Sequence, residues 1–139
     1  MELIYAYTRQ QAIEDGVLLH FEQFLQTELP DAEDAGKHLD RLNGVDGKFP
    51  LGELVITPAA AGVLRPGDVL NCLTRHRLGD WGQLHAEDVA ANEDALLQQD
   101  RLFSVYHVPN KQDERQEVRF YIITEWNREA TTVLLPGDY

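Results

Sequence analysis

Cysteine and long apolar runs are scarce in this chain, and each scarcity excludes a class of protein. Cys72 is the one cysteine among 139 residues, so no internal disulfide can form and a reducing interior is the expected setting. No stretch approaches the roughly 18 apolar residues that a membrane-spanning helix requires. Residues 1–5 hold no basic segment leading into a long apolar run. We therefore expect a soluble cytoplasmic protein without a membrane span.

Basic residues are also scarce, with 12 lysines and arginines against 24 aspartates and glutamates and a formal net charge of −12. Acidic and basic residues number 10 and 4 over residues 1–50, 8 and 3 over 51–100, and 6 and 5 over 101–139. Phosphate contacts need a basic face, so the sequence predicts no direct nucleic-acid binding and favours a basic partner. Two interpretations stay open: the acid serves solubility, as in most small acidic proteins, or it forms a docking face that imitates DNA phosphates.

Catalytic motifs are missing as well. The histidines lack the His-x-x-x-His spacing of zinc sites, and a single cysteine excludes clustered zinc motifs. Phosphate-cradling glycine loops are absent, and Ser104 lacks the nucleophile elbow. We expect no catalytic residue, no metal and no cofactor. The alternative is a small divalent-metal-dependent nuclease or hydrolase, whose cation would be held by Asp80, Glu87, Asp88, Glu125 and His107.

The first third of the chain contains short elements. Residues 4–7 are β-prone, and Thr8 with Gln11 forms a capping box that predicts a helix through Ile13. Residues 17–21 are predicted as a strand followed by a helical turn. Glycine-rich turns over residues 43–48 mark a boundary. We expect a small acidic α/β lobe over 1–48 and an α+β domain over 49–139, which together form two units or one compact one.

Three helices are predicted in the middle of the chain. Thr57 caps the first over residues 59–64, with Pro58 in its first turn. The second opens at residue 66, ends at Gly79, and carries an apolar stripe formed by Val69, Cys72, Leu73 and His76. Cys72 on that stripe is interpreted as a packed hydrophobe. The third covers residues 86–97 with acids in its first turn, where the helix dipole favours them.

Three strands close the chain, over residues 102–108, 118–125 and 131–135. The connecting lengths suit an antiparallel meander. Residues 120–123 are apolar on both faces, which predicts a central strand with helices packed against the sheet. The predicted fold class is therefore α+β: a C-terminal three-stranded antiparallel meander packed by two or three helices, with the small N-terminal α/β lobe.

Two residues near the third helix carry specific expectations. Asn92 shares the buried face with Val89 and Leu96, and its amide is predicted to bond to the backbone of the preceding helical turn. Trp81, between Gly79 and Gly82, is interpreted as an aromatic plug between helix and sheet. The alternative for Trp81 is an exposed hot spot for a partner.

The region 51–139, about two thirds of the chain, resembles a group of uncharacterised accessory proteins from bacterial plasmids, phages and integrated elements. The matching residues are Gly79, Asp80, Trp81, Gly82, Glu87, Asp88, Asn92, Ile122, Ile123, Thr124, Glu125, Arg128, Thr131, Thr132 and Pro136. The group brings no established activity. The resemblance implies a mobile-element setting.

Charge and resemblance together predict a non-enzymatic protein-binding factor of a mobile element. It would inhibit a host DNA-targeting defence enzyme, in the manner of anti-restriction or anti-CRISPR proteins with a DNA-mimicking face. The expected partner is a basic, nucleic-acid-binding host protein, and pairing of two copies through a sheet edge stays open. The residues assigned to partner binding are Asp31, Glu33, Asp34, Asp80, Trp81, Glu87, Asp88, Glu93 and Asp94, and those assigned to structure are Thr57, Pro58, Gly79, Gly82 and Asn92.

Overall fold

A computed structural model describes residues 9–26, 42 and 47–139. The helices are α2 (Arg9–Glu14), α3 (Phe21–Gln26), α5 (Pro58–Val63), α6 (Pro66–Arg77), α7 (Ala86–Gln98) and the 3-10 turn η1 (Pro136–Asp138). The strands are β1 (Leu19–His20), β2 (Glu53–Ile56), β3 (Leu102–Pro109), β4 (Glu117–Thr124) and β5 (Ala130–Leu134). The predicted strand over residues 4–7 and the acids Asp31, Glu33 and Asp34 lie outside the described residues.

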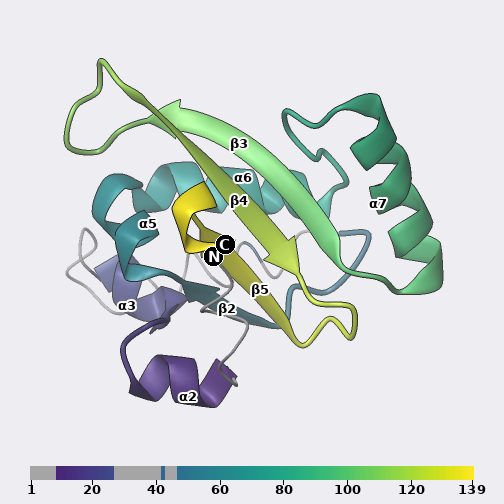
Figure 1. Cartoon of the computed structure of the whole chain (residues 1–139), viewed down its shortest axis with the longest axis horizontal. Helices are drawn as coiled ribbons and strands as arrows, with labels where there is room; N and C mark the ends of the chain where they lie inside the picture. The colour runs from purple at the N-terminus through teal and green to yellow at the C-terminus, as the bar shows by residue number, and fades with distance from the viewer. Residues whose placement is uncertain (1–8, 27–41, 43–46) are drawn as a thin grey trace.

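The strands form one five-stranded mixed sheet in the order β1-β2-β5-β4-β3 (Figure 1). The predicted meander is confirmed, because β4 pairs antiparallel with both β3 and β5. β2 runs parallel to β5, with Val55 opposite Thr132, a pairing that the sequence analysis missed. Local patterns do not reveal it, because about seventy residues separate the two strands and a parallel pair leaves no turn signal. The α+β class is confirmed, with β5 in the middle of the sheet.

The described part of the N-terminal lobe is built into the same sheet and core. β1 pairs antiparallel with β2 through Leu19 and Ile56, and α3 places Phe21, Phe24 and Leu25 in the main hydrophobic cluster. The strand-then-helix prediction for this stretch is confirmed. Residues 19–25 therefore share the sheet and the core with the rest of the described chain.

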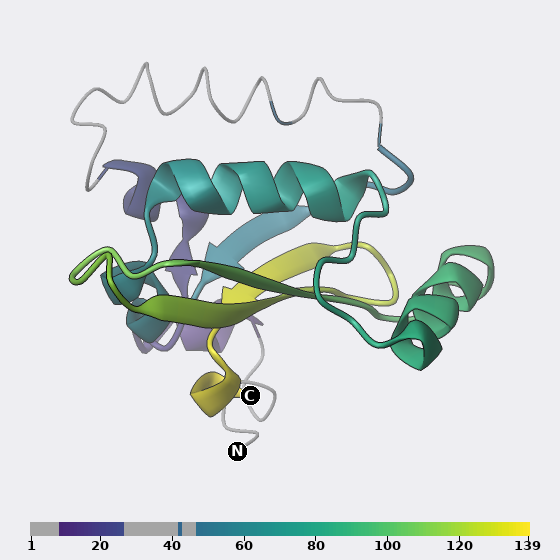
Figure 2. The same ribbon diagram turned by 90° about the horizontal axis from the view of Figure 1, so that it is seen from above.

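Helix α6 lies across one face of the sheet, as Figure 2 shows. Its predicted apolar stripe is confirmed, since Val69, Cys72, Leu73 and His76 are all buried. Burial raises the pKa of the Cys72 thiol to about 11, so this cysteine is a packed, unreactive thiol, as interpreted. No helix in the described ranges has the length and apolar character that crossing a membrane requires.

The start of α5 is fixed by the predicted cap. The Thr57 hydroxyl accepts a hydrogen bond from the Ala60 N–H at 3.2 Å, and Pro58 occupies the first turn. The same hydroxyl donates to the Asp138 carboxylate at 2.6 Å, and that carboxylate also accepts from the Leu135 N–H. Thr57 therefore ties the beginning of α5 to the turn η1 as well as capping its own helix.

Candidate functional site

Helix α7 stands beside the β3 edge of the sheet and covers neither face (Figures 1 and 2). Its bounds agree with the predicted helix over 86–97, and Glu87 and Asp88 lie in the first turn. Only Asn92 and Ala95 of this helix are buried. A helix buried along so narrow a strip needs specific attachments, because little apolar area holds it in place.

The chain reaches α7 through a Schellman turn at the end of α6. Gly79 adopts a φ of +83°, which glycine tolerates at no steric cost. Its N–H donates to the His76 carbonyl at 3.1 Å, and the Asp80 N–H donates to the Arg75 carbonyl at 2.8 Å. The predicted C-terminal cap at Gly79 is confirmed.

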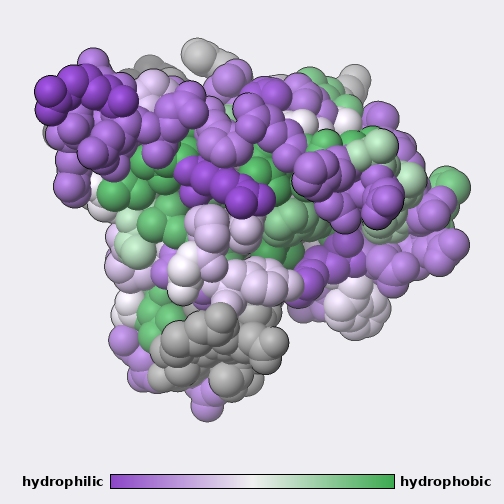
Figure 3. All heavy atoms as spheres, turned by 45° about the horizontal axis from the view of Figure 1, so that its top comes forward, coloured by the Kyte–Doolittle hydropathy of each residue, from purple (hydrophilic) through white to green (hydrophobic). Residues whose placement is uncertain are grey.

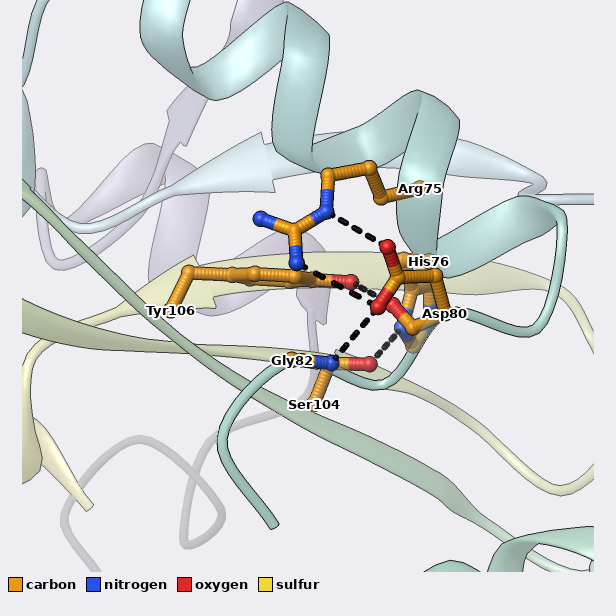
Figure 4. Close-up of polar contacts among 6 residues, drawn as sticks. All are labelled: Arg75, His76, Asp80, Gly82, Ser104 and Tyr106. Carbon is orange, nitrogen blue, oxygen red and sulfur yellow. Dashed lines mark hydrogen bonds and ion pairs between the residues drawn. The ribbon is translucent and has the colours of Figure 1, made fainter.

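The Asp80 carboxylate stabilises this turn through hydrogen bonds. Its carboxylate accepts from Arg75 Nε at 2.8 Å and Nη2 at 3.2 Å, and from the Gly82 N–H at 3.2 Å (Figure 4). These contacts, led by the Arg75 hydrogen bond, lower the pKa of Asp80 below its ordinary value. The Asp80 carbonyl accepts from the Tyr106 hydroxyl at 2.6 Å. Asp80 is therefore hydrogen-bonded within its own chain, while its side chain remains 53% exposed.

Trp81 is buried, with 3% of its surface exposed. Its ring stacks on Phe49 at 6.1 Å between centroids and meets His76 edge-on at 5.6 Å. The indole N–H donates to the Glu93 carboxylate of α7 at 3.1 Å. The aromatic-plug interpretation is confirmed and the exposed hot spot is wrong, because the surrounding rings leave no free indole face.

The segment after Trp81 and the side chain of Asn92 cover the outer edge of β3. The Val105 N–H donates to the Trp81 carbonyl at 3.1 Å, and the Gln83 N–H donates to the Val105 carbonyl at 2.8 Å. Gly82 fits here because a Cβ would lie 1.9 Å from the Val105 oxygen. The structural assignment of Gly82 is therefore confirmed. Sheet edges attract foreign strands, and this edge is closed by the chain itself at Val105.

Asn92 closes the same edge at Phe103. Its amide donates to the Phe103 carbonyl at 2.6 Å, and its side-chain oxygen accepts from the Phe103 N–H at 3.1 Å. Burial of Asn92 is confirmed, but the predicted partner in the preceding helical turn is wrong. Within a helix the neighbouring N–H and C=O groups are already paired, so a buried amide is satisfied only by a second element.

Arg128 holds the other end of α7. Its guanidinium donates to the Ala95 carbonyl at 3.1 Å, which also accepts from the Gln99 and Asp100 N–H groups, and to the Asp100 carbonyl at 2.6 Å just after the helix. A third bond joins it to the Glu125 carbonyl at 3.1 Å. Burial lowers the pKa of Arg128 below its ordinary value. Arg128 therefore anchors the C-terminal end of α7 to the β4–β5 turn.

Helix α7 carries exposed acids that are not engaged. Glu87, Asp88 and Asp94 are exposed, and none of them forms an ion pair with another described residue. The run from residue 78 to residue 100 contains no lysine or arginine. These three residues, with Glu93 behind them, are called the α7 acidic surface below.

Four of the acids elsewhere in the described ranges, Asp80 among them, form an ion pair with a described arginine. Glu53 lies 3.0 Å from Arg9, Glu114 lies 2.7 Å from Arg65, and Asp113 lies 3.0 Å from Arg115. Such exposed pairs contribute little to stability, but they cancel charge locally. The α7 acidic surface therefore keeps a negative field that these other acids do not.

A serine and a histidine also meet in the core. Ser104 Oγ lies 2.5 Å from His76 Nδ1, and Thr124 Oγ1 lies 2.9 Å from His76 Nε2. Thr124 continues to Thr131 at 2.8 Å, and Thr131 donates to the Leu51 carbonyl at 2.7 Å. The Leu51 carbonyl can only accept, so Thr131 donates to it and in turn accepts from the Thr124 hydroxyl. Thr124 then accepts from the imidazole, which places the imidazole proton on Nε2, and Nδ1 accepts from the Ser104 hydroxyl.

This Ser–His contact is structural. Ser104 and His76 are both completely buried, so no substrate reaches them, and burial lowers the pKa of His76 to about 3. The imidazole is therefore neutral at physiological pH, as the chain of donors requires. The sequence analysis had placed His76 on the apolar stripe and had not found its partners.

The residues of the alternative metal site do not assemble. Among the described residues, no three histidine, cysteine, aspartate or glutamate side chains lie close enough to hold a cation, and Asp80 is occupied by Arg75. The proposed grouping of Asp80, Glu87, Asp88, Glu125 and His107 is therefore wrong. Of the acids assigned to partner binding, Glu87, Asp88 and Asp94 lie together on α7, and Glu93 joins them while bonded to Trp81.

The sequence analysis did not predict the roles of three residues that hold this region together. They are Arg75, Tyr106 and Arg128. Arg75 is five residues from Asp80, a spacing that a helix-terminal ion pair allows, so a local signal existed. Tyr106 and Arg128 had none, because their partners come from other elements. No family model, curated protein or solved structure matches the chain.

Proposed function

We propose that this chain is a non-enzymatic binding factor whose α7 acidic surface docks on a basic macromolecular partner. The observation that carries the proposal is that Glu87, Asp88 and Asp94 are exposed on one helix, within residues 78–100 that contain no lysine or arginine. Acids that only maintain solubility would not require a helix that is held to the rest of the protein by three separate sets of hydrogen bonds.

Rigid attachment is the second support. Asn92, Glu93 and Arg128 fix α7 to β3, to Trp81 and to the β4–β5 turn. Because α7 is already held in place, its acids lose less conformational entropy when a partner binds. A basic partner would be steered to them by long-range attraction.

The charge density of α7 bears on the kind of partner. Its 13 residues span about 20 Å, so its four carboxylates give about one charge per 5 Å. Duplex DNA carries about one charge per 1.7 Å. α7 alone therefore has a lower charge density than a duplex, so it would occupy only part of a nucleic-acid-binding groove on a basic protein. Within that class, a nucleic-acid-binding host enzyme of the kind that attacks mobile elements is the partner we propose.

The test compares two triple variants of equal charge. E87Q/D88N/D94N neutralises the α7 acidic surface, and E22Q/E117Q/E129Q removes the same number of exposed charges elsewhere. Each immobilised chain would be incubated with nuclease-treated host lysate at about 0.1 M salt, where screening acts beyond about 10 Å.

We expect wild type and the control triple to retain the same basic nucleic-acid-binding protein, released as salt rises, and the α7 triple to lose it. DNA added to the retained complex should compete. Equal loss in both triples would show that only total charge matters and would overturn the assignment to α7.

A further inference from the structure

Two large hydrophobic side chains are strongly exposed near the C-terminal end of α7. Leu97, in the last turn of that helix, is 86% exposed, and Trp126, in the turn between β4 and β5, is 62% exposed. Arg128 joins the two segments, because its guanidinium bonds to the Asp100 carbonyl just after α7 and to the Glu125 carbonyl beside Trp126. Figures 1 and 2 show the β4–β5 turn next to this end of the helix. Leu97 and Trp126 are called the apolar pair below.

The apolar pair continues a line of exposed residues along α7. This line consists of Glu87, Ala90, Asp94 and Leu97. Their spacing of three, four and three residues places them on one side of the helix, and at 1.5 Å per residue the line is about 15 Å long. Ala90 is small and leaves room between the acids for another helix to approach closely. The line therefore has acids along most of its length and apolar surface at one end.

The surface around the line is mainly hydrophilic. Figure 3, in which α7 lies at the right, shows mostly hydrophilic residues there and few hydrophobic ones. A single exposed apolar side chain is common on proteins. Among the described residues, however, only Leu78, Leu97 and Trp126 are exposed large hydrophobics, and two of these three lie on the segments that Arg128 joins. Because tryptophan is enriched among the residues that contribute most to protein interfaces, the apolar pair indicates a contact site.

Charge decides among the possible occupants of this site. A second copy in a symmetric contact would bring the same acids close to each other. An anionic lipid surface or a nucleic acid would be repelled by the net charge of −12. A polybasic segment without apolar side chains would pair with the acids but leave the apolar pair in water. A basic helix with an apolar residue near one end matches both parts, because its side chains recur at the same spacing as those of α7.

We propose that the apolar pair and the acids Glu87 and Asp94 together bind a basic amphipathic helix of a partner protein, which lies along α7. This inference rests on the proposed function, because it specifies the partner of the α7 acidic surface. The acids would steer the helix to α7, and burial of the two apolar side chains would slow its release. The charge contribution is screened by salt, whereas the apolar contribution is not, so each can be measured separately.

The experiment measures binding of a labelled synthetic helix to the full chain by fluorescence anisotropy. The probe is an alanine-based peptide of about 14 residues, about 21 Å long as a helix. It carries two lysines seven residues apart and a leucine three residues beyond the second, and a probe of reversed sequence covers the antiparallel orientation. A control peptide of the same composition has these residues on different sides of the helix. We expect one probe to bind saturably and at least about ten times more tightly than the control peptide.

Serine variants test the apolar contribution. Leu97→Ser and Trp126→Ser should each weaken the probe at least about tenfold, whereas Leu78→Ser, just after α6, should leave binding unchanged. All three variants should keep the urea midpoint of wild type, because the side chains that they replace are exposed. Trp126 also provides a direct signal, since the other tryptophan, Trp81, is buried. Its emission should shift to shorter wavelength when the probe binds.

Charge variants test the acids. E87Q/D94N should weaken the probe and remove most of the salt dependence of its binding. The matched pair E22Q/E117Q removes the same charge elsewhere and should change binding by less than about twofold. If both charge variants bind the probe alike, the proposed function fails together with this inference. If E87Q/D94N loses the probe while both Leu97→Ser and Trp126→Ser bind it fully, the α7 acidic surface stands and the apolar contact is wrong.

Three other results would overturn the inference. Equal binding of probe and control peptide would mean that no helical partner is recognised. Self-association of wild type that Trp126→Ser abolishes, seen by sedimentation, would assign the apolar pair to a contact between two copies. Binding of the chain to phosphatidylserine vesicles, lost in the same variant, would assign it to a lipid surface.

Discussion

The buried imidazole of His76 makes the stability of this protein depend on pH in a calculable way. Burial lowers its pKa from 6.5 to about 3, so below about pH 6.5 the unfolded chain binds a proton that the folded chain excludes. Stability is therefore full above the unfolded pKa and falls as pH decreases toward the folded pKa. The loss reaches about 1.4 kcal/mol at about pH 5.5 and grows by about 1.4 kcal/mol for each further pH unit.

The assay is urea unfolding at about pH 7.5 and about pH 5.5, a window in which ordinary carboxylates stay ionised. His76→Gln retains one donor and one acceptor for Thr124 and Ser104 but does not titrate. Between the two pH values, wild type should therefore lose about 1.4 kcal/mol more of its free energy of unfolding than His76→Gln does. The exposed His85→Gln should behave as wild type does.

Equal losses in wild type and His76→Gln would refute this reasoning, because the acid sensitivity would then come from other groups. A second readout is the ring nitrogen spectrum of His76. It should show a neutral imidazole protonated on Nε2 at both pH values, as the chain of donors from Ser104 to Leu51 requires.

Three further predictions concern the attachment of α7. Asn92→Ala leaves the Phe103 N–H and C=O unpaired, which should cost about 1–3 kcal/mol and accelerate hydrogen exchange at the Phe103 amide; unchanged exchange would contradict the edge-closing role. Gly82→Ala brings a Cβ to 1.9 Å from the Val105 oxygen at a φ of +74° and should destabilise by at least about 2 kcal/mol, whereas Gly62→Ala, with no atom in contact distance, should be neutral or stabilising by thermal denaturation. Trp81→Ala should cost about 3–5 kcal/mol by urea unfolding; a loss near zero would mean that the indole is not part of the core.

Local sequence patterns predicted many of the secondary-structure elements of this protein. Thr57 with Pro58 set the start of α5 and Gly79 set the end of α6, because capping depends on groups within four residues of each other. Apolar spacing gave the stripe from Val69 to His76, and the runs between turn residues gave the meander of β3, β4 and β5. The exposure of the α7 acids was also readable, because charged side chains without a partner stay in water.

Tertiary structure decided which groups from distant elements meet. The parallel pairing of β2 with β5, the bonds of Asn92 to Phe103, and the anchoring of α7 by Arg128 join residues with no local relation in sequence. The same packing buried Trp81, whereas Asp80 stayed exposed beside Arg75. Chain order specifies short-range capping and periodicity, whereas the partner of a buried polar group is fixed only when a second element arrives to satisfy it.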